Sequence, residues 1–517
     1  MENKLKKSTV VICMVLIILL QVIVRIYVGN RKEYFHIDEA YSYALMNYDK
    51  IDITDNSDFY DNWHNKKYYI DYLSVNEDEK FDFRAVYENQ KNDVHPPLYY
   101  LLLRIAASFT IDSFTKWTGI ILNIVIFVFS SIFIYLICSK LFKNQILALF
   151  ATLITGLTIG ALDTTAYIRM YELANLFILM ITYAHMKIFD KEDLELNDLI
   201  FIGTTALLAS LTHYYTIMYM FVLFVMFAVK YIKKKQYKNL AKYVATFAIA
   251  AGLSLAIFPY SLYHMFGGYR GAGAKSNLFN LDSLFVEAGQ CFYILQKGAA
   301  NNLGLLLILI YIILKQKAKN LEGKDKIINL IFIPSIIYFL LVAKMSPYKE
   351  LRYFMPIVSV STIWLIYTFY ILYKNILKEK DAILVTILTF VIVIVSPIVT
   401  KTKLDFTFTK MNHLAERIAE KSDLPAMYII NENNLRFLDD IYLFTEFEDS
   451  YIMRSSNASI ENIENVMKDK DMSKGIVLVF NEGVDSDSII SQIKAKYNYS
   501  KDELMQNLNA GKVVYVY

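Results

Sequence analysis

Long apolar runs separated by short basic loops restrict the fold of this chain more than any other feature of its sequence. Of its 517 residues, 56% are hydrophobic and only 20% are charged. A helix needs about 20 mostly apolar residues to cross the hydrocarbon core of a bilayer, and many of the runs approach this length. The sequence therefore predicts an α-helical polytopic membrane protein.

About eleven of these runs are expected to span the membrane. They are Val10 to Val28, Trp117 to Cys138, Ile146 to Leu162, Leu173 to Lys187, Leu199 to Thr212, Ile217 to Tyr231, Val244 to Tyr263, Leu303 to Leu314, Ile328 to Ala343, Phe354 to Tyr373 and Ala382 to Val399. Lysines gather at one end of the predicted spans, in residues 230–242, 315–326 and 374–380. Basic loops favour the cytoplasmic side, so we expect a cytoplasmic N-terminus and an extracytoplasmic C-terminus. Because the basic residues are confined to such loops, the formal net charge of +3 gives no indication of nucleic-acid binding.

A polar loop and a short apolar segment follow the first span. The loop, residues 30–95, is long enough to be a functional element and is expected on the extracytoplasmic side. The apolar segment begins at His95-Pro96-Pro97 and contains Arg104, whose charge would cost about 2.5–3.5 kcal/mol at the bilayer centre. If this segment crossed the membrane, the basic loops after it would face outward. We therefore expect residues 95–109 to form a juxtamembrane helix in the outer leaflet.

After the last predicted span, the composition becomes that of a soluble module. Short β-like runs (Ala426 to Ile430, Ser450 to Met453, Gly475 to Phe480, Lys512 to Tyr517) alternate with helical stretches (His413 to Lys421, Ile460 to Lys468, Ser486 to Tyr497). The alternation predicts a small extracytoplasmic α/β domain over residues 404–517, after a transmembrane domain over residues 1–403. It contains no glycine-rich phosphate pattern, which favours a docking or acceptor-presenting role.

Polar residues that interrupt the apolar runs fall on the predicted outer side. They are Asp38 and Glu39; Asp93 and His95; Asp163, Tyr167, Arg169, Tyr171 and Glu172; His213, Tyr214 and Tyr215; and Lys344, Tyr348, Lys349, Arg352 and Tyr353. Five separate connections supply them. This convergence indicates an interfacial active site, whereas a transporter is expected to bury its ionisable groups near the bilayer midplane.

The adjacent acids Asp38 and Glu39 lie just outside the first span. A carboxylate at this height suits a general base, which typically accelerates a reaction by roughly 10²- to 10⁴-fold. The alternative is structural, because acidic residues at a helix start also cap the helix and stabilise its dipole.

The stretch Asp93-Val94-His95-Pro96-Pro97 predicts an anion site. Proline suits the first helical turn and holds the preceding residue extended, so His95 comes just ahead of a helix N-terminus, where phosphate binds readily. Arg169 and Arg352 lie at the ends of spans, where a guanidinium binds phosphate through two hydrogen bonds. Anchoring of lipid headgroups explains both arginines equally well. His213, at a tight corner between two spans, is explained equally by an interfacial structural role.

Five motifs occur in an order that resembles a known family. They are Asp38-Glu39-Ala40-Tyr41, His95-Pro96-Pro97-Leu98-Tyr99-Tyr100, Arg169-Met170-Tyr171, Thr212-His213-Tyr214-Tyr215 and Arg352-Tyr353. Together they resemble the polyprenyl-phosphate-sugar-dependent glycosyltransferases of the GT-C fold, above all the protein O-mannosyltransferase and lipid A aminoarabinose transferase group. The likeness extends over about the first 400 residues.

The resemblance implies an inverting glycosyltransferase that moves a hexose or pentose from a polyprenyl-phosphate donor. It makes Asp38 the catalytic residue, acting as general base, with Glu39 as a supporting acid. The remaining expected site residues are His95, Arg169, Arg352 and Lys349 for the donor phosphate and lipid, and Tyr41, Asp93, Tyr99, Tyr171, His213 and Tyr214 for the sugar or acceptor pocket.

The expected partners are the polyprenyl-phosphate-linked sugar, membrane lipids and a glycan, lipid or protein acceptor in a bacterial cell envelope. No cofactor is implied, but a divalent cation near Glu39, Asp93 or His213 stays open. One alternative function is a membrane polysaccharide polymerase or ligase, which uses the same kind of donor. The other is a lipid or sugar transporter.

Overall fold

The computed structural model describes residues 5–47, 53–279, 282–317, 326–431 and 436–517. The chain forms two compact units, and each is described by itself. The helical unit comprises Met1–Val28, Gln90–Tyr99 and Ile120–Leu404. The mixed unit comprises Gly29–Asn89, Tyr100–Gly119 and Asp405–Tyr517.

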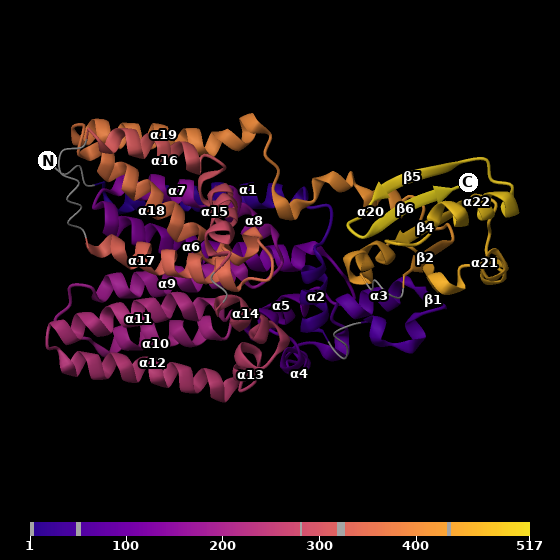
Figure 1. Ribbon diagram of the computed structural model, residues 1–517, viewed down its shortest axis with the longest axis horizontal. Helices are drawn as coiled ribbons and strands as arrows, with labels where there is room; N and C mark the ends of the chain where they lie inside the picture. Colours follow the sequence, from indigo (N-terminus) through magenta and orange to yellow (C-terminus); the bar gives the residue numbers. More distant parts are fainter. Residues whose placement is uncertain (1–4, 48–52, 280–281, 318–325, 432–435) are drawn as a thin grey trace. The chain divides into compact units, whose positions relative to one another are not determined.

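Within the described residues, seven helices are long and apolar enough to cross a membrane. They are α1 (Lys7–Asn30), α6 (Lys116–Phe142), α11 (Tyr215–Lys233), α12 (Tyr237–Ile257), α17 (Asn329–Met345), α18 (Met355–Lys374) and α19 (Glu379–Thr400). Two bent pairs add further spans if each pair is counted as one: α7 (Gln145–Thr155) with α8 (Ile159–Ala166), and α15 (Leu284–Ala300) with α16 (Gly304–Lys315). Figure 1 shows α10, α11 and α12 running side by side. The predicted polytopic helical fold is confirmed.

Each of the eleven predicted spans overlaps a helix or a bent helix pair, but α15 was not predicted and the count of eleven is not confirmed. The two remaining helices are α9 (Tyr171–Ile188) and α10 (Leu196–Ser210). α10 has 15 residues and a length of about 22 Å, shorter than a hydrocarbon core of about 30 Å. α9 contains Glu172, Asn175 and His185 and is buried on nearly every side among α10, α11, α17 and α18. Its polar residues therefore face protein.

Three short helices accompany the long ones: α5 (Leu98–Ala107), α13 (Ser261–Phe266) and α14 (Tyr269–Phe279). α5 begins directly after Pro96-Pro97, and its ten residues extend about 15 Å, half of what a span needs. The amide of Leu98 donates a hydrogen bond to the carbonyl of Leu211 over 3.0 Å, which holds the helix start against the corner that carries His213. Its location along the membrane surface stays a prediction.

A six-stranded sheet in the order β1-β3-β2-β4-β6-β5 organises the mixed unit. The strands are β1 (Asn62–Asn65), β2 (Ala426–Ile430), β3 (Asp449–Arg454), β4 (Ile476–Asn481), β5 (Asp502–Asn507) and β6 (Gly511–Val516). β2 pairs in parallel with β3 and β4, and the other pairings are antiparallel. Every residue of β2 and β4 is buried, as expected of the two central strands of the sheet.

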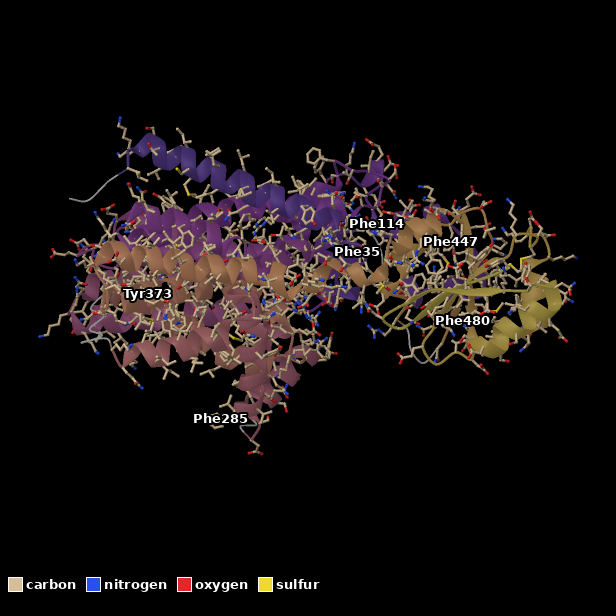
Figure 2. The ribbon with its side chains drawn as sticks, turned by 90° about the horizontal axis from the view of Figure 1, so that it is seen from above. Phe35, Phe114, Phe285, Tyr373, Phe447 and Phe480 are labelled. Carbon is tan, nitrogen blue, oxygen red and sulfur yellow. The ribbon has the colours of Figure 1, made fainter. Side chains whose placement is uncertain are left out.

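Three helices complete the C-terminal part of this unit: α20 (Leu414–Ala419), α21 (Ile460–Met467) and α22 (Ser486–Tyr497). Ile463 of α21 and Ile490 of α22 belong to the same hydrophobic core as Leu478 and Phe480 of β4. Phe480 is labelled in Figure 2. This packing buries one face of the sheet and stabilises the domain through apolar burial.

The predicted small C-terminal α/β domain is confirmed, and the first loop adds to it. The four predicted strands correspond to β2, β3, β4 and β6, and the three predicted helices to α20, α21 and α22. The sequence did not indicate β5 or β1, and β1 brings the first loop into the sheet, with Trp63 opposite Tyr451. The first loop also forms α2 (Ile37–Met46), α3 (Lys66–Leu73) and α4 (Arg84–Asn92). The prediction grouped residues 30–95 with the membrane domain; in the structure, Gly29–Asn89 belong to the mixed unit and the rest of the loop, from Gln90 onward, to the helical unit.

Candidate active site

Helix α2 begins with a capping box formed by His36 and Glu39. The Nδ1 atom of His36 accepts a hydrogen bond from the amide of Asp38 over 3.1 Å. The Glu39 carboxylate accepts one from the amide of His36 over 2.7 Å. These two bonds satisfy amide groups that a helix start otherwise leaves without partners. The capping role that the sequence offered as an alternative is therefore present, and Glu39 performs it.

Glu39 also forms a buried ion pair with Lys32. The Lys32 ammonium lies 2.9 Å from Oε2 of Glu39, and both side chains are fully buried. Lys32 donates a further hydrogen bond to the carbonyl of Phe406 over 2.8 Å. The hydrogen bond from Lys32 to Phe406 joins the first loop to the C-terminal segment, and both lie in the mixed unit. A catalytic role for Glu39 stays a prediction.

Asp38 is the accessible member of the acidic pair. Its side chain is 29% exposed, and its Oδ2 lies 3.8 Å from Nδ1 of His36. Tyr41, one turn later, is half-buried. The carboxylate that the resemblance makes catalytic is thus the one within reach of solvent.

Aromatic packing holds α2 in place beneath this carboxylate. The ring of Phe114 lies 5.1 Å from that of Phe35 and 5.0 Å from that of Tyr43, measured between centroids. Phe35 and Phe114 are labelled in Figure 2. The Tyr43 hydroxyl donates a hydrogen bond to the carbonyl of Thr115 over 2.9 Å. The helix that carries Asp38 is therefore attached on its buried side.

In the helical unit, Asp93 and His95 form a close pair. Oδ2 of Asp93 lies 2.9 Å from Nδ1 of His95, and the two side chains are about one-fifth exposed, at 19% and 21%. Burial opposes the ionisation of Asp93, but the charges of His95 and Arg169 outweigh it and lower the pKa of Asp93. Asp93 therefore stays ionised and favours the protonated imidazole of His95.

His213 lies beside the pair formed by Asp93 and His95, but its own ring is uncharged. Its ring centroid is 5.9 Å from that of His95 and 5.4 Å from that of Tyr171. Burial, followed by the charges of His95 and Arg169, lowers the pKa of His213 well below its usual value. His213 is therefore a neutral ring at neutral pH.

Arg352 joins the same group through Tyr167. The Arg352 side chain, in the short 3₁₀ helix η5 (Leu351–Tyr353), donates a hydrogen bond to the Tyr167 hydroxyl over 3.2 Å. Its Nε lies 2.9 Å from a carboxylate oxygen of Glu350. The Tyr167 ring stacks on that of Tyr171, with centroids 5.7 Å apart. Arg352 is thereby linked to the ring that contacts His213.

Three other predicted residues have contacts of their own. Lys349 donates to the carbonyl of Ala343 over 2.7 Å and lies 3.7 Å from Glu287. Tyr99 is fully buried, and its hydroxyl donates to Oδ1 of Asn123 over 3.2 Å. The Tyr214 hydroxyl lies 2.9 Å from Nδ1 of His264. All three residues belong to the helical unit.

The structure thus brings together part of the predicted site. Asp93, His95, Arg169, Tyr171 and His213 form one group in the helical unit, with Arg352 attached through Tyr167. Asp38, Glu39 and Tyr41 lie in the mixed unit. Tyr167 was among the outward polar residues but had been given no role.

Sequence reasoning missed two acids in the mixed unit, one of which, Asp439, interacts with Asp38. Asp439 and Asp440 are buried, and the charge of Asp38 acts on Asp439. The only local signal was a pair of adjacent acids between apolar residues, in Phe437-Leu438-Asp439-Asp440-Ile441.

A divalent-cation site gains no support from the residues that the structure describes. Among them, no three His, Cys, Asp or Glu side chains are grouped as metal ligands. Of the three residues considered for a cation, Asp93 and His213 lie in the helical unit and Glu39 in the mixed unit, where it pairs with Lys32.

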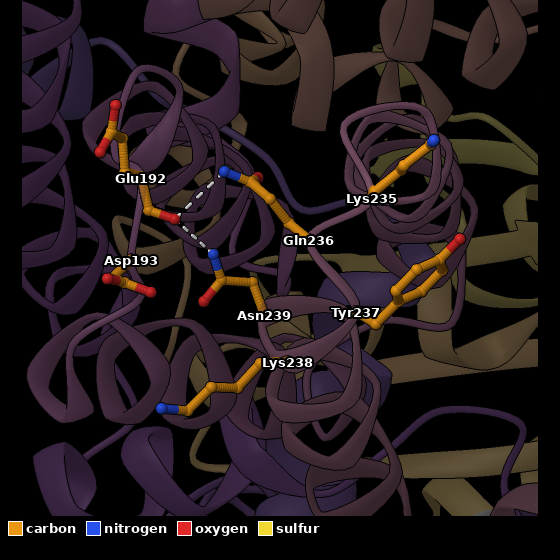
Figure 3. A pocket seen from close by; sticks show the side chains of 7 residues that line it. All are labelled: Glu192, Asp193, Lys235, Gln236, Tyr237, Lys238 and Asn239. Atoms are coloured by element: carbon orange, nitrogen blue, oxygen red, sulfur yellow. Dashed lines mark hydrogen bonds between the residues drawn. The ribbon is translucent and has the colours of Figure 1, made fainter.

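A polar cavity of about 400 Å³ lies at the other end of α9 (Figure 3). It is lined by Glu192, Asp193, Lys235, Gln236, Tyr237, Lys238 and Asn239. The side chains of Gln236 and Asn239 both donate hydrogen bonds to the carbonyl of Glu192. The 18 residues of α9 place about 27 Å of helix between this end and Tyr171, so the cavity is separate from the candidate site.

The segment of the chain that contains His95, Arg169, Tyr171 and His213 matches a known protein family. Residues 94–258 match the family model described as dolichyl-phosphate-mannose-protein mannosyltransferase. The predicted resemblance to these transferases is confirmed. The matched segment includes His95, Arg169, Tyr171 and His213, while Asp38 and Arg352 lie outside it. No curated protein matches the chain.

Two crystal structures of ArnT from Cupriavidus metallidurans are similar to this chain. The structure bound to undecaprenyl phosphate is 10% identical, with a TM-score of 0.49, over 99% of this chain and 98% of that chain. The apo structure is 10% identical, with a TM-score of 0.45, over 96% of this chain and 97% of that chain.

Proposed function

We propose that this chain is an inverting glycosyltransferase that moves a sugar from a polyprenyl-phosphate donor to an acceptor hydroxyl on the extracytoplasmic side of the membrane. The supporting observation is the grouping of Asp93, His95, Arg169 and His213, of which the last three lie within residues 94–258, the segment that matches the mannosyltransferase family. The description of that family specifies mannose on dolichyl phosphate, which is a polyprenyl phosphate.

The helical unit is proposed to hold the departing lipid phosphate. That phosphate is a stable anion and needs positive charge held in place rather than a strong acid. His95, Arg169 and Arg352 supply the charge, and Asp93 keeps His95 protonated. The loss of one preorganised group of this type costs roughly 10²- to 10³-fold in rate.

The neutral His213 ring and the neighbouring tyrosines are proposed to line the sugar or acceptor pocket. The ring of His213 contacts that of Tyr171, and Tyr99 and Tyr214 lie in the same unit. Lys349, which pairs with Glu287, contributes charge to the lipid phosphate from a greater distance.

Asp38 is proposed to act as the general base. Its carboxylate takes the proton of the acceptor hydroxyl while the oxygen attacks the anomeric carbon. The attack comes from the face opposite the phosphate, so the C–O bond to phosphate breaks with inversion. Glu39 acts indirectly, because its capping bonds and its pair with Lys32 hold the turn that carries Asp38.

The test uses the full chain in detergent or nanodiscs with radiolabelled polyprenyl-phosphate hexoses and pentoses, including dolichyl-phosphate mannose. Wild-type protein should release the free lipid phosphate in the presence of an envelope extract as acceptor. Asp38→Asn should abolish release, whereas Asp78→Asn, an exposed acid of the same loop, should leave it intact. Full activity of Asp38→Asn would remove Asp38 from the role of base.

A further inference from the structure

The C-terminal segment of the mixed unit supplies a carboxylate to the start of α2. Asp439 ends the short 3₁₀ helix η8 (Phe437–Asp439), which packs against α2. Its carboxylate accepts a hydrogen bond from the amide of Ile37, the first residue of α2. The side chain of Arg436 lies 2.7 Å from Oδ2 of Asp439, and Asp439 is only 1% exposed. Burial raises the pKa of Asp439, and Arg436 and the hydrogen bond from Ile37 oppose this rise. The charged form of a carboxylate is also favoured at a helix N-terminus.

Asp440, the next residue, is fully buried and carries a different charge. The Tyr34 hydroxyl donates a hydrogen bond to Oδ1 of Asp440, and Tyr442 packs edge-on against the ring of Tyr34. Burial raises the pKa of Asp440 to about 8, against the hydrogen bond from Tyr34, and the charge of Asp439 adds to the rise. Asp440 is therefore mostly protonated at neutral pH, and Asp439 is the acid of this pair that acts on Asp38.

We propose that Asp439 is a positioning residue for Asp38: it anchors the first turn of α2 through the Ile37 amide and sets a second carboxylate beside that of Asp38. This inference rests on the proposed function, because it assumes that Asp38 is the base. It also gives the C-terminal domain a part in the reaction that goes beyond docking.

The charges of Asp38 and Asp439 change each other's proton affinity by the same amount. The charge of Asp38 favours the protonated form of Asp439, so the charge of Asp439 favours proton uptake by Asp38 to the same extent. A carboxylate beside a like charge is a stronger base. The other titratable groups near these acids are Arg436, which faces Asp439; Tyr34 and Tyr442, which face Asp440; Tyr428, which interacts with both Asp439 and Asp440; and His36, which faces Asp38.

Three substitutions of Asp439 separate the effect of its charge from the effect of its hydrogen bond with the Ile37 amide. Asparagine keeps an oxygen that can accept the Ile37 hydrogen bond but removes the charge, alanine removes both, and glutamate keeps the charge. Asp469→Asn, at an exposed acid of the same domain, is the matched control. Each full-chain variant is assayed for kcat and KM against pH with dolichyl-phosphate mannose, and for hydrogen–deuterium exchange of the amides of residues 37–46.

For Asp439→Asn, we expect the acid limb of the kcat profile to move to lower pH. We also expect kcat at neutral pH to fall roughly threefold to tenfold, because a weaker base transfers the proton less readily. The donor KM and the exchange of α2 should stay unchanged. Asp439→Ala should show the same shift and, in addition, faster exchange at the start of α2. Asp439→Glu should restore the wild-type profile.

The outcomes distinguish this inference from the proposed function. If Asp38→Asn is inactive and both Asp439→Asn and Asp439→Ala keep the wild-type pH profile, the positioning role is wrong and the proposed function stands. If Asp38→Asn is active, the proposed function is wrong, and the role of Asp439 towards a catalytic Asp38 is overturned with it. Unchanged exchange at α2 in Asp439→Ala would overturn the anchor in either case, without reference to activity.

Discussion

Oδ2 of Asp93 lies 2.9 Å from Nδ1 of His95, and the two side chains precede the helix that starts at Leu98. Asp93 is ionised and favours the protonated imidazole of His95. In the proposed function, this pair supplies charge to the lipid phosphate. The strength of that charge should therefore depend on Asp93 and on pH.

We expect Asp93→Asn to raise the donor KM about tenfold at pH 8, a loss of about 1.4 kcal/mol in binding. The effect should shrink near pH 6, because His95 is then protonated without help from Asp93. Steady-state assays at both pH values, with the acceptor saturating, measure the difference. Asp82→Asn, at an acid that belongs to the mixed unit, is the control. An equal change in KM at both pH values would argue against a charge effect through His95.

Glu39 should matter more for stability than for the chemical step. Glu39→Leu leaves the buried ammonium of Lys32 without its carboxylate, and breaking a buried pair in this way costs about 3–5 kcal/mol. The double variant Lys32→Met, Glu39→Leu should recover most of that loss, which thermal unfolding of the full chain can measure. Glu77→Ala, which breaks the more exposed pair with Lys80, should cost less than about 1 kcal/mol. A catalytic acid would instead lose turnover in Glu39→Gln with little change in Tm.

The parts of the fold that the sequence predicted are those with a local signal. A run of about 20 apolar residues indicates a spanning helix, and five apolar residues in a row indicate β2. β1 has four residues and only Trp63 among its apolar side chains, and it pairs with β3 from a distant part of the sequence. Pairing at that distance leaves no local pattern, so the first loop could not be assigned to the sheet.

The same distinction holds for the candidate site. His95 was predicted because two prolines restrict the backbone around it, and this restriction is local. Asp439 was missed because its proximity to Asp38 arises from packing between η8 and α2. Glu39 was predicted as an acid, but its partner Lys32 is buried by tertiary contacts that the sequence did not indicate.

Arg352 should contribute to donor binding through the shape of its guanidinium. The Tyr167 hydroxyl and Glu350 hold this group from two sides. We expect Arg352→Lys to raise the donor KM about tenfold or more, because an ammonium cannot reproduce two parallel hydrogen bonds to phosphate. The acceptor KM should change little. Lys374→Ala, at the opposite end of α18, is the control. An unchanged donor KM in Arg352→Lys would contradict the phosphate assignment.

Asp440 should make the stability of the protein fall as the pH rises. Burial raises its pKa from an ordinary 3.8 to about 8 in the folded state, so between these values the folded state binds a proton that the unfolded state has released. The stabilisation that comes from protonated Asp440 is complete below about pH 4 and is lost as the pH rises towards 8. This loss is on the order of a few kcal/mol. Asp440→Asn cannot titrate, so its Tm should decline less than that of the wild type between pH 5 and pH 8. Asp469→Asn, at an exposed carboxylate, should keep the wild-type decline. Parallel Tm curves for Asp440→Asn and the wild type would show that Asp440 releases its proton at the same pH in the folded and unfolded chains.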